Sequence, residues 1–474
     1  MLLRRLYDTK LAQASYLIGC QTTGDAIVVD PNRDIEQYIR AAADEELRIA
    51  YVTETHIHAD FVSGSRELAH WAGATLLLSD EGGDDWRYDF AAASNATLLH
   101  DGDAIMVGNV RLRVLHTPGH TPEHISFLIT DAAASDRPMG ALTGDFIFVG
   151  DVGRPDLLER AANLEGTMVA GARALFASIQ RFKQFPDYLQ IWPGHGAGSA
   201  CGKALGALPS TTLGYEAIAN WALAETTEEE FVRMVLAGQP EPPKYFAHMK
   251  RINKTGPRML GGFNRPPHRP PEELAVLLAR GALVVDTRNA VEFAEAFVPG
   301  TINIPLNKSF TTWMGSLVPF TGDFYLIVDT STTRSIDDAV RNLAMIGLDL
   351  VSGYFGTDAV MSGSGRHALS TVTQATVRDL ADRMRRVDVQ VIDVRGASEW
   401  DAGHLPGVRN IPLGSLSDHL GELSRERPVV VHCQGGGRSA IAASVLLASG
   451  FEHVENLTGG YAAWVTEGLP VEGN

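Results

Sequence analysis

The feature that most limits the possible folds is an internal repeat in the second half of the chain. The stretch V-V-D-T-R-N-A-V-E-F-A-E-A-F-V-P-G-T-I-N-I-P-L begins at Val284, and V-I-D-V-R-G-A-S-E-W-D-A-G-H-L-P-G-V-R-N-I-P-L begins at Val391. The two align without a gap at a constant offset of 107 residues. A repeat this long indicates two copies of one structural unit. Each copy holds an apolar run before a helix-forming stretch, Tyr325–Val328 and Val429–His432, which predicts a parallel sheet with helices on both faces.

Length and composition bound the rest of the chain. At roughly 150 residues per domain, 474 residues suggest about three domains. Hydrophobic residues make up 45 % and charged residues 20 %, which excludes wholesale disorder. A net charge of −17 without a basic patch argues against a nucleic-acid partner, and no segment is apolar enough to span a membrane. We therefore predict an α/β multidomain protein with a first domain over residues 1–224, an extended Pro-rich linker over 225–271, and α/β domains over 272–365 and 372–474.

The cysteines and the first strands indicate the cellular location. Three cysteines in 474 residues exclude a disulfide framework and fit a reducing cytosol. Leu17–Cys20 matches a lipoprotein cleavage box, but Asp8 and Lys10 interrupt the apolar stretch that such a signal needs. The sequence instead predicts paired strands over Ala14–Cys20 and Ala26–Asp30, and a cytoplasmic protein.

In the first domain, side chains that bind metals follow short apolar strands. The strand Ile49–Thr53 runs into T-H-I-H-A-D, and later strands run into T-P-G-H-T, T-G-D and P-G-H-G. These motifs supply His56, His58, Asp60, His120, Asp145 and His195. Because loops at the C-terminal ends of strands meet at one edge of a sheet, the imidazoles and carboxylates are predicted to form a metal site.

The H-x-H-x-D motif with its later His, Asp and His resembles the metallo-β-lactamase superfamily over about residues 1–215, which implies an N-terminal αββα sandwich. Dinuclear hydrolases of that superfamily carry a further His after the Asp, where this chain has Phe61. Phenylalanine cannot bind a metal, so the second metal site lacks a ligand unless another group substitutes. Within the superfamily the sequence is most similar to the persulfide dioxygenases. That resemblance implies one Fe(II) per chain, held by His56, His120 and Asp145.

The same resemblance suggests roles for the residues around these ligands. His58, Asp60 and His195 are expected to orient the ligands or line the pocket. Arg154, in G-D-V-G-R-P-D, either meets an anionic substrate group or forms an ion pair. Cys201, in G-A-G-S-A-C-G-K, is either buried and inert or relays sulfur as a persulfide.

A second candidate site lies in the last domain. Residues 429–439 read V-V-V-H-C-Q-G-G-G-R-S, an apolar strand that runs into a glycine-rich loop and a helix. Because the N–H groups of such a loop and the helix N-terminus favour an anion, Cys433 is predicted to act as a thiolate nucleophile, with Arg438 as a cation at the rim. The other residues of the predicted persulfide-binding loop are Gln434, Gly435, Gly436, Gly437 and Ser439.

This loop, with D-V-R, G-H-L-P-G and N-I-P-L before it, resembles the rhodanese family over about residues 372–474. The spacing from Cys433 to Arg438 matches the sulfurtransferase loop, which is shorter than that of related phosphatases. In the first copy, Asp329 aligns with Cys433, and Ser331, Thr332 and Thr333 replace the glycines. Since a carboxylate cannot carry sulfane sulfur, residues 272–365 are expected to form a degenerate rhodanese domain with a packing or positioning role.

Together the resemblances imply a bacterial persulfide dioxygenase–rhodanese fusion that acts in sulfide detoxification. The first reaction would be RSSH + O₂ + H₂O giving RSH and sulfite, and the second would carry sulfane sulfur on Cys433 to sulfite, which forms thiosulfate. The expected partners are a low-molecular-weight persulfide, O₂ and sulfite or thiosulfate, in a homo-oligomer. The thiol carrier, whether glutathione, coenzyme A or another, and the direction of sulfur flow stay open. So do two alternatives: a thioester metallohydrolase with an attached sulfurtransferase, and a non-enzymatic sulfur-relay protein.

Overall fold

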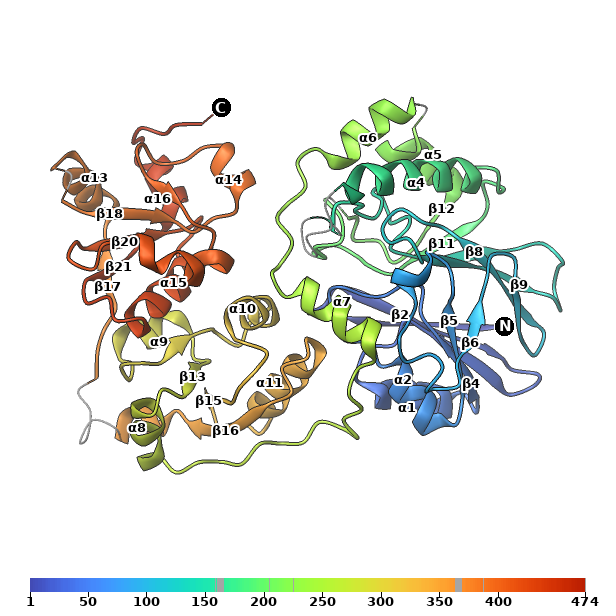
Figure 1. Ribbon diagram of the computed structural model, residues 1–474, viewed down its shortest axis with the longest axis horizontal. Helices are drawn as coiled ribbons and strands as arrows, with labels where there is room; N and C mark the ends of the chain where they lie inside the picture. The colour runs from blue at the N-terminus through green and yellow to red at the C-terminus, as the bar shows by residue number, and fades with distance from the viewer. Residues whose placement is uncertain are drawn as a thin grey trace. The chain divides into compact units, whose positions relative to one another are not determined.

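The structure is a computed structural model that describes residues 1–157, 159, 166–203, 205–224, 226–362, 369–386 and 388–473 (Figure 1). Glu225, where the predicted linker begins, residues 363–368 at the end of the predicted 272–365 domain, and Asn474 lie outside the described residues. The chain divides into two compact units, Met1–Gly262 with Ala344–Gly347, and Phe263–Leu343 with Leu348–Asn474. Among the described residues, no helix has the length and apolar character needed to cross a membrane.

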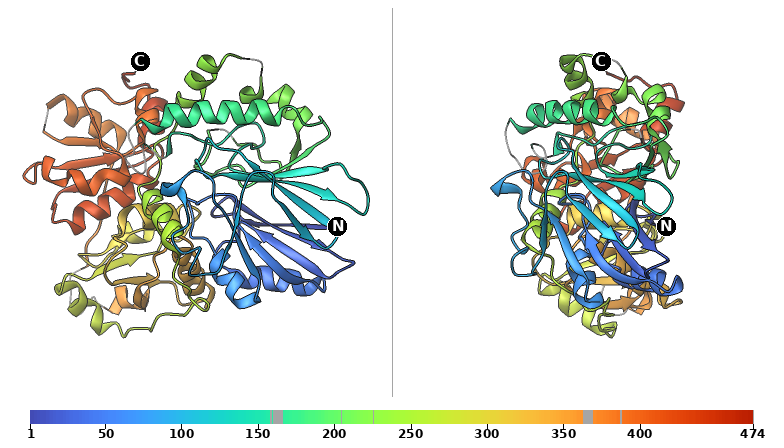
Figure 2. Two further views of the ribbon diagram at one scale, coloured as in Figure 1. Left: turned by 45° about the vertical axis from the view of Figure 1, so that its right-hand side comes forward. Right: turned by 90° about the vertical axis from the view of Figure 1, so that its right-hand side faces the viewer.

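The first unit is built on two six-stranded sheets that stack face to face between helices (Figure 2). One sheet has the order β1-β2-β3-β4-β5-β6, and the other has the order β12-β11-β10-β9-β8-β7. The strands are β1 (Leu2–Asp8), β2 (Gln13–Cys20), β3 (Asp25–Val29), β4 (Arg48–Thr53), β5 (Thr75–Ser79), β6 (Thr97–Leu99), β7 (Ala104–Val107), β8 (Val110–His116), β9 (Ile125–Asp131), β10 (Gly140–Gly144), β11 (Gln190–Pro193) and β12 (Thr211–Thr212).

Alternating side chains explain why these sheets stack. Successive side chains of a strand point to opposite faces. In β9, Phe127 and Ile129 therefore enter the core between the sheets, while Leu128 packs in the core under the helices. The helices of this unit are α1 (Ile35–Asp44), α2 (Ser65–Ala72), η1 (Asp84–Trp86), α4 (Thr167–Phe182), α5 (Leu213–Ala219), η2 (Trp221–Leu223), α6 (Glu228–Leu236) and α7 (Phe246–Thr255). The expected αββα sandwich is confirmed.

The predicted pairing at the start of the chain is also confirmed. β2 and β3 run antiparallel, with Gly19 opposite Ala26 and Cys20 opposite Asp25. Cys20 therefore sits at the end of a paired strand, as the strand interpretation requires, and its side chain is buried.

The predicted linker over 225–271 is not extended throughout, because two helices lie within it. It contains α6 and α7, and Phe231 of α6 packs into the core beneath the second sheet. Met249 of α7 is fully buried. The prolines lie between and after the two helices rather than in them, so the average composition of the segment concealed two short amphipathic helices.

The second unit holds two parallel sheets, and the repeat places matching strands at matching positions. One sheet has the order β14-β13-β15-β16, and the other has the order β17-β21-β20-β18-β19. Their strands are β13 (Leu283–Asp286), β14 (Ile302–Asn303), β15 (Phe324–Val328), β16 (Val351–Gly356), β17 (Thr373–Ala375), β18 (Gln390–Asp393), β19 (Arg409–Asn410), β20 (Val429–His432) and β21 (Val454–Leu457). The helices are α8 (Glu272–Ala279), α9 (Ala290–Glu295), α10 (Phe310–Leu317), α11 (Arg334–Met345), α12 (Asp358–Ser362), α13 (Val377–Arg386), α14 (Ala397–Asp401), η4 (Leu413–Glu422), α15 (Gly437–Ala448) and α16 (Gly460–Thr466).

Both copies use the same buried polar contacts beside their central strand. Arg288 pairs with Asp286, and Asn303 donates its side-chain amide to the carbonyl oxygens of both. In the second copy, Arg395 pairs with Asp393, and Asn410 makes the equivalent two hydrogen bonds.

The two copies also contact each other directly. The backbone N–H of Asn303, on the edge strand β14, donates to the Ser444 hydroxyl of α15 at 2.8 Å, and both groups are buried. A backbone donor of the first copy is therefore satisfied by a side chain of the second.

Candidate metal centre and sulfur-transfer loop

Three buried side chains converge at the edge of the sandwich where loops from both sheets meet. His56 follows β4, His120 follows β8, and Asp145 follows β10. One ligand atom from each lies within 4.8 Å of the others. Asp145 Oδ2 is 3.9 Å from His56 Nε2 and 3.6 Å from His120 Nε2. The structure thus brings together the ligand set that the sequence suggested.

The second nitrogen of each imidazole is held by a neighbouring oxygen. His56 Nδ1 lies 2.9 Å from the Thr55 hydroxyl, which itself donates to Asp30, so Nδ1 carries the proton. His120 Nδ1 donates to the carbonyl oxygen of Arg154 at 3.0 Å. Both Nε2 atoms are therefore unprotonated and face Asp145, as second-sphere hydrogen bonds typically arrange metal-binding histidines.

The protonation states of His56 and His120 are those of metal-binding histidines. Burial lowers the pKa of His56 well below its usual range, and burial followed by the charge of Lys250 lowers the pKa of His120 to about 3. Both rings are therefore neutral near pH 7, the form that binds metals. His56 Nε2 and both oxygens of Asp145 are buried without a hydrogen-bond partner. A divalent cation would satisfy these atoms.

A second group of candidate ligands lies beside the first and consists of Asp60, His195 and Cys201. His195 Nε2 is 3.3 Å from Asp60 Oδ2 and 3.4 Å from Asp145 Oδ1. Burial, with the charges of Asp145 and Asp60, raises the pKa of the Cys201 thiol well above its usual range. Phe61 packs against the His58 ring, and its phenyl group has no atom that could bind a metal. Cys201 instead supplies a sulfur atom to this second group.

His58 and Arg154 contact protein groups instead of joining either ligand group. His58 Nε2 lies 3.2 Å from Asp30, and although burial works in the opposite direction, that carboxylate raises the pKa of His58 to about 9. Arg154 is completely buried, pairs with Asp156, and donates to the carbonyl oxygens of Ala200 and Pro240. Of the two roles considered for Arg154, the ion pair is the one observed, and its backbone carbonyl is what orients His120.

Two residues of this site were missed in the sequence. His124 Nε2 accepts the backbone N–H of Asp145 at 3.1 Å, and its ring stacks on His56. It lies four residues after His120 in T-P-G-H-T-P-E-H, so the motif itself carried the signal. Asn253 of α7 donates to the carbonyl oxygens of His58 and Phe61 and accepts the N–H of Ser63. Because it is separated from them by about 190 residues, no local pattern could have revealed it.

At the end of β20, the loop from Cys433 to Ser439 wraps around a buried sulfur atom. Gly436 N–H donates to Cys433 Sγ at 3.1 Å, and the Ser439 hydroxyl lies 3.5 Å away. Gly436 has φ +100°, which allows the chain to turn into α15, and α15 begins at Gly437. Gln434 contacts Arg395 through its side-chain oxygen, whereas Gly435 has open space around it.

The rim cation of this loop has a carboxylate partner that sequence analysis did not assign. Arg438 pairs with Glu399 through two hydrogen bonds of 2.5 and 2.7 Å. This pairing lowers the pKa of Glu399. Glu399 belongs to the internal repeat, and its counterpart in the first copy is Glu292.

The corresponding loop of the first copy lacks this chemistry. Asp329 is exposed at the end of β15 and accepts hydrogen bonds from the backbone N–H and the hydroxyl of Ser331. These hydrogen bonds lower the pKa of Asp329. The Asp329 carboxylate therefore forms a turn with Ser331 in its own loop, and the loop carries no thiol.

Comparisons with known proteins identify both parts. A model described as the metallo-beta-lactamase superfamily matches residues 8–195, and one described as a rhodanese-like domain matches residues 376–467. The crystal structure of a metallo-beta-lactamase from Staphylococcus aureus is 43 % identical and covers 75 % of this chain and 99 % of that chain, with a TM-score of 0.67. The mitochondrial persulfide dioxygenase ETHE1 of Bos taurus is 26 % identical over 200 residues, which are 41 % of this chain and 68 % of the relative.

A beta-lactamase hydrolase-like protein of Xylella fastidiosa is 27 % identical over 279 residues, 53 % of this chain, and the match spans 60 % of that relative. The chain belongs to the metallo-beta-lactamase superfamily. More particularly, it is a fusion of a metallo-beta-lactamase domain that has persulfide dioxygenase homologues with a C-terminal rhodanese-like domain.

Proposed function

We propose that this protein oxidises a low-molecular-weight hydropersulfide with O₂ to sulfite at one Fe(II), and transfers sulfane sulfur through Cys433 to give thiosulfate. The observation that carries the proposal is the buried group of His56, His120 and Asp145, with its unpartnered ligand atoms. Two imidazoles and one carboxylate with open positions are typical of non-haem Fe(II) oxygenases. The persulfide dioxygenase among the relatives supports this assignment.

Within this site, iron would supply the redox chemistry with O₂ that zinc cannot provide. The chain's own residues would hold the ligands in place. Thr55 and the Arg154 carbonyl keep the Nδ1 proton of each imidazole away from the metal. His124 holds the backbone N–H of Asp145.

The transfer step would proceed in two balanced displacements at Cys433. The thiolate attacks the outer sulfur of RSSH, the carrier leaves as a thiol, and a Cys433 persulfide forms. Sulfite then attacks the outer sulfur of that persulfide, which gives thiosulfate and restores the thiolate. Gly436 N–H and the Ser439 hydroxyl already contact the sulfur atom and would stabilise its negative charge.

We further propose that the sheet β14-β13-β15-β16 is a degenerate rhodanese domain with a positioning role. Its Asp286–Arg288 pair and Asn303 repeat the contacts made by Asp393, Arg395 and Asn410. The exposed Asp329 loop offers no nucleophile for sulfur transfer.

A specific observation also favours a second candidate function, a metallohydrolase of thioesters. Asp60, His195 and Cys201 form a second potential ligand group next to Asp145, and two adjacent metals would activate water for hydrolysis. Under this alternative the chain would bind two metal ions.

The deciding experiment measures O₂ uptake and metal content together. Protein purified without oxygen is assayed with glutathione persulfide and coenzyme A persulfide, and sulfite and thiosulfate are measured by ion chromatography. We expect about one iron per chain and O₂ uptake with sulfite formation. Hydrolysis of a glutathione thioester with two zinc ions and no O₂ uptake would establish the hydrolase instead. Sulfur transfer without either reaction would establish a sulfur-relay protein.

A further inference from the structure

The Arg438 guanidinium, at the rim of the Cys433 loop, is bound to a carboxylate that the proposed transfer step does not use. Two hydrogen bonds of 2.5 and 2.7 Å join its two terminal nitrogens to the two oxygens of Glu399. The pKa of Arg438 is raised, first by these hydrogen bonds and further by the charges of Glu399 and Cys433, although burial works in the opposite direction. Arg438 therefore interacts with Glu399 and with the sulfur atom at the same time.

Glu399 is also held by its own helix. It lies in the first turn of α14, and its Oε2 accepts the backbone N–H of Gly396 at 3.3 Å, as in a capping box. The hydrogen bonds from Arg438 lower the pKa of Glu399, so the carboxylate is ionised at neutral pH. The negative charge of Glu399 is therefore fixed beside the guanidinium.

The other guanidinium that reaches this loop is already bound to a second carboxylate. Arg395 contacts Gln434 at 3.4 Å, but it is buried and forms an ion pair with Asp393. The pair at the rim is more open, because the side chains of Arg438 and Glu399 are 27 % and 36 % exposed. An anion that approaches the loop from solvent therefore meets Arg438 together with Glu399.

The proposed chemistry creates more negative charge in this loop than Arg438 can balance. Attack of sulfite on the Cys433 persulfide leaves a Cys433 thiolate beside a thiosulfate dianion. Arg438 carries one positive charge, and Glu399 already balances it. Repulsion between Glu399 and thiosulfate therefore adds to repulsion from the thiolate, and both favour departure of the product.

We propose that Glu399 is a positioning residue that limits the affinity of the Cys433 loop for thiosulfate, because it shares the Arg438 guanidinium with the bound anion. A loop that held its product more tightly would release it more slowly, and product release sets the turnover rate of many enzymes. The identity of the product rests on the proposed function, whereas competition between Glu399 and an anion for Arg438 does not.

The first test measures anion binding without turnover. Titration calorimetry on the full chain uses sulfate, which has the shape and charge of thiosulfate but no sulfane sulfur to transfer. Glu399→Gln keeps the size of the side chain and removes its charge. We expect it to bind sulfate about fivefold more tightly than the parent, as for removal of one partly exposed charge. Unchanged or weaker binding would overturn the proposal, since Glu399 would then do no more than hold Arg438 in place.

Two further comparisons test whether the effect passes through Arg438. In the Arg438→Gln background, Glu399→Gln should have a much smaller effect on sulfate affinity, because the shared cation is gone. Glu467→Gln is the matched control, since Glu467 is another arginine-paired glutamate of the same domain and binds Arg378. An undiminished effect without Arg438, or an equal gain in the Glu467 variant, would mean that net charge is responsible and would overturn the proposal.

Kinetics separate failure of this assignment from failure of the proposed function. When thiosulfate forms from glutathione persulfide and sulfite, inhibition by added thiosulfate should be about fivefold stronger in Glu399→Gln, and the difference should shrink at high salt. Glu399→Asp keeps the charge and should stay close to the parent. Thiosulfate formation with the same inhibition constant in Glu399→Gln and the parent would refute the role of Glu399 and leave the sulfurtransferase standing. Tighter sulfate binding in Glu399→Gln without thiosulfate formation by the parent would do the reverse.

Discussion

At the scale of single residues, hydrogen bonds to Nδ1 decide which nitrogen of each imidazole is available to a metal. Thr55 performs this task for His56, and the Arg154 carbonyl performs it for His120. Arg154 therefore influences the site through its backbone, while its buried side chain binds Asp156. The conformation of the Arg154 loop is what matters for ligand orientation.

Replacing one candidate ligand tests the metal assignment directly. His120→Ala or Asp145→Ala leaves two of three ligands, so we expect bound iron to fall well below one per chain and O₂ uptake to fall by at least ~100-fold. His70→Ala, an exposed histidine on α2, is the control and should keep both properties. Full O₂ uptake without His120 would remove the basis for the iron site.

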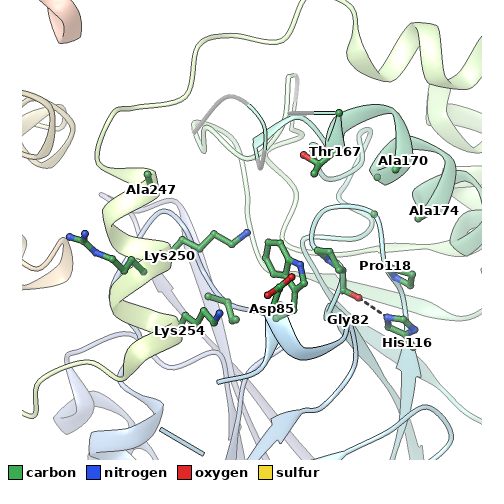
Figure 3. Close-up of a pocket in the computed structure, with 17 residues that line it drawn as sticks. Gly82, Asp85, His116, Pro118, Thr167, Ala170, Ala174, Ala247, Lys250 and Lys254 are labelled. Atoms are coloured by element: carbon green, nitrogen blue, oxygen red, sulfur yellow. Dashed lines mark hydrogen bonds between the residues drawn. The ribbon is translucent and has the colours of Figure 1, made fainter. Parts of the chain in front are cut away.

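At the scale of elements, α7 has two structural roles that its sequence alone did not predict. Lys250, Arg251 and Lys254, on one side of the helix, line a cavity in the first unit (Figure 3). Asn253, on the same helix, donates hydrogen bonds to the loop that follows His56. Asn253 is buried and satisfies one N–H and two carbonyl groups of that loop. The helix therefore anchors the strand-end loop as well as forming a wall of the cavity.

Asn253→Ala should destabilise the first unit by about 2–3 kcal/mol, since it leaves buried backbone groups of the loop without partners. Urea unfolding followed by circular dichroism measures the change, with Glu229→Ala, an exposed residue on α6, as the control. A change below about 0.5 kcal/mol would mean that water replaces the amide and that α7 does not anchor the loop.

In the Asp329 loop, a carboxylate stands where the second copy has Cys433. Asp329→Ala should leave sulfur transfer at Cys433 within about twofold of the parent, because the described hydrogen bonds of that carboxylate go to Ser331 in its own loop. Transfer of sulfur from thiosulfate to cyanide is the measurement, and Cys433→Ser serves as the inactive reference. A folded Asp329 variant without transferase activity would show that the first copy takes part in the reaction.

At the scale of the whole molecule, the two candidate sites lie in separate compact units, so the two reactions should be separable. Cys433→Ser keeps the loop's size but cannot form a persulfide, because a serine hydroxyl stays protonated at neutral pH. We expect O₂ uptake to persist while the product changes from thiosulfate to sulfite. Ion chromatography under equal persulfide and O₂ measures this. Unchanged thiosulfate would point to Cys201, and loss of O₂ uptake would mean that the rhodanese-like domain supplies the metal site.

Whether a feature could be predicted depends on how far apart its contacting residues lie in the sequence. The αββα sandwich, the β2–β3 pair and the group of His56, His120 and Asp145 depend on short motifs at strand ends, which a single sequence reveals. The repeat likewise revealed both parallel sheets. Asn253, Lys254 and the Glu399–Arg438 pair depend on contacts between distant segments, which no local pattern encodes. The α7 helix was missed for a different reason, because proline content averaged over 225–271 concealed a short helix that contains no proline.

The hydrogen bond from Asn303 to Ser444 bears on how freely the two copies can accumulate substitutions. Because the Asp329 loop is exposed and carries no thiol, its exposed residues should accept almost any side chain. The strand Ile302–Asn303 should not, because α15 of the second copy packs against it and Ser444 satisfies its backbone donor. Saturation mutagenesis scored for folded protein should therefore find positions 331–333 permissive and positions 302, 303 and 444 restrictive. Substitutions in the first copy would then be limited by its packing against the second copy, and not by chemistry at its own loop.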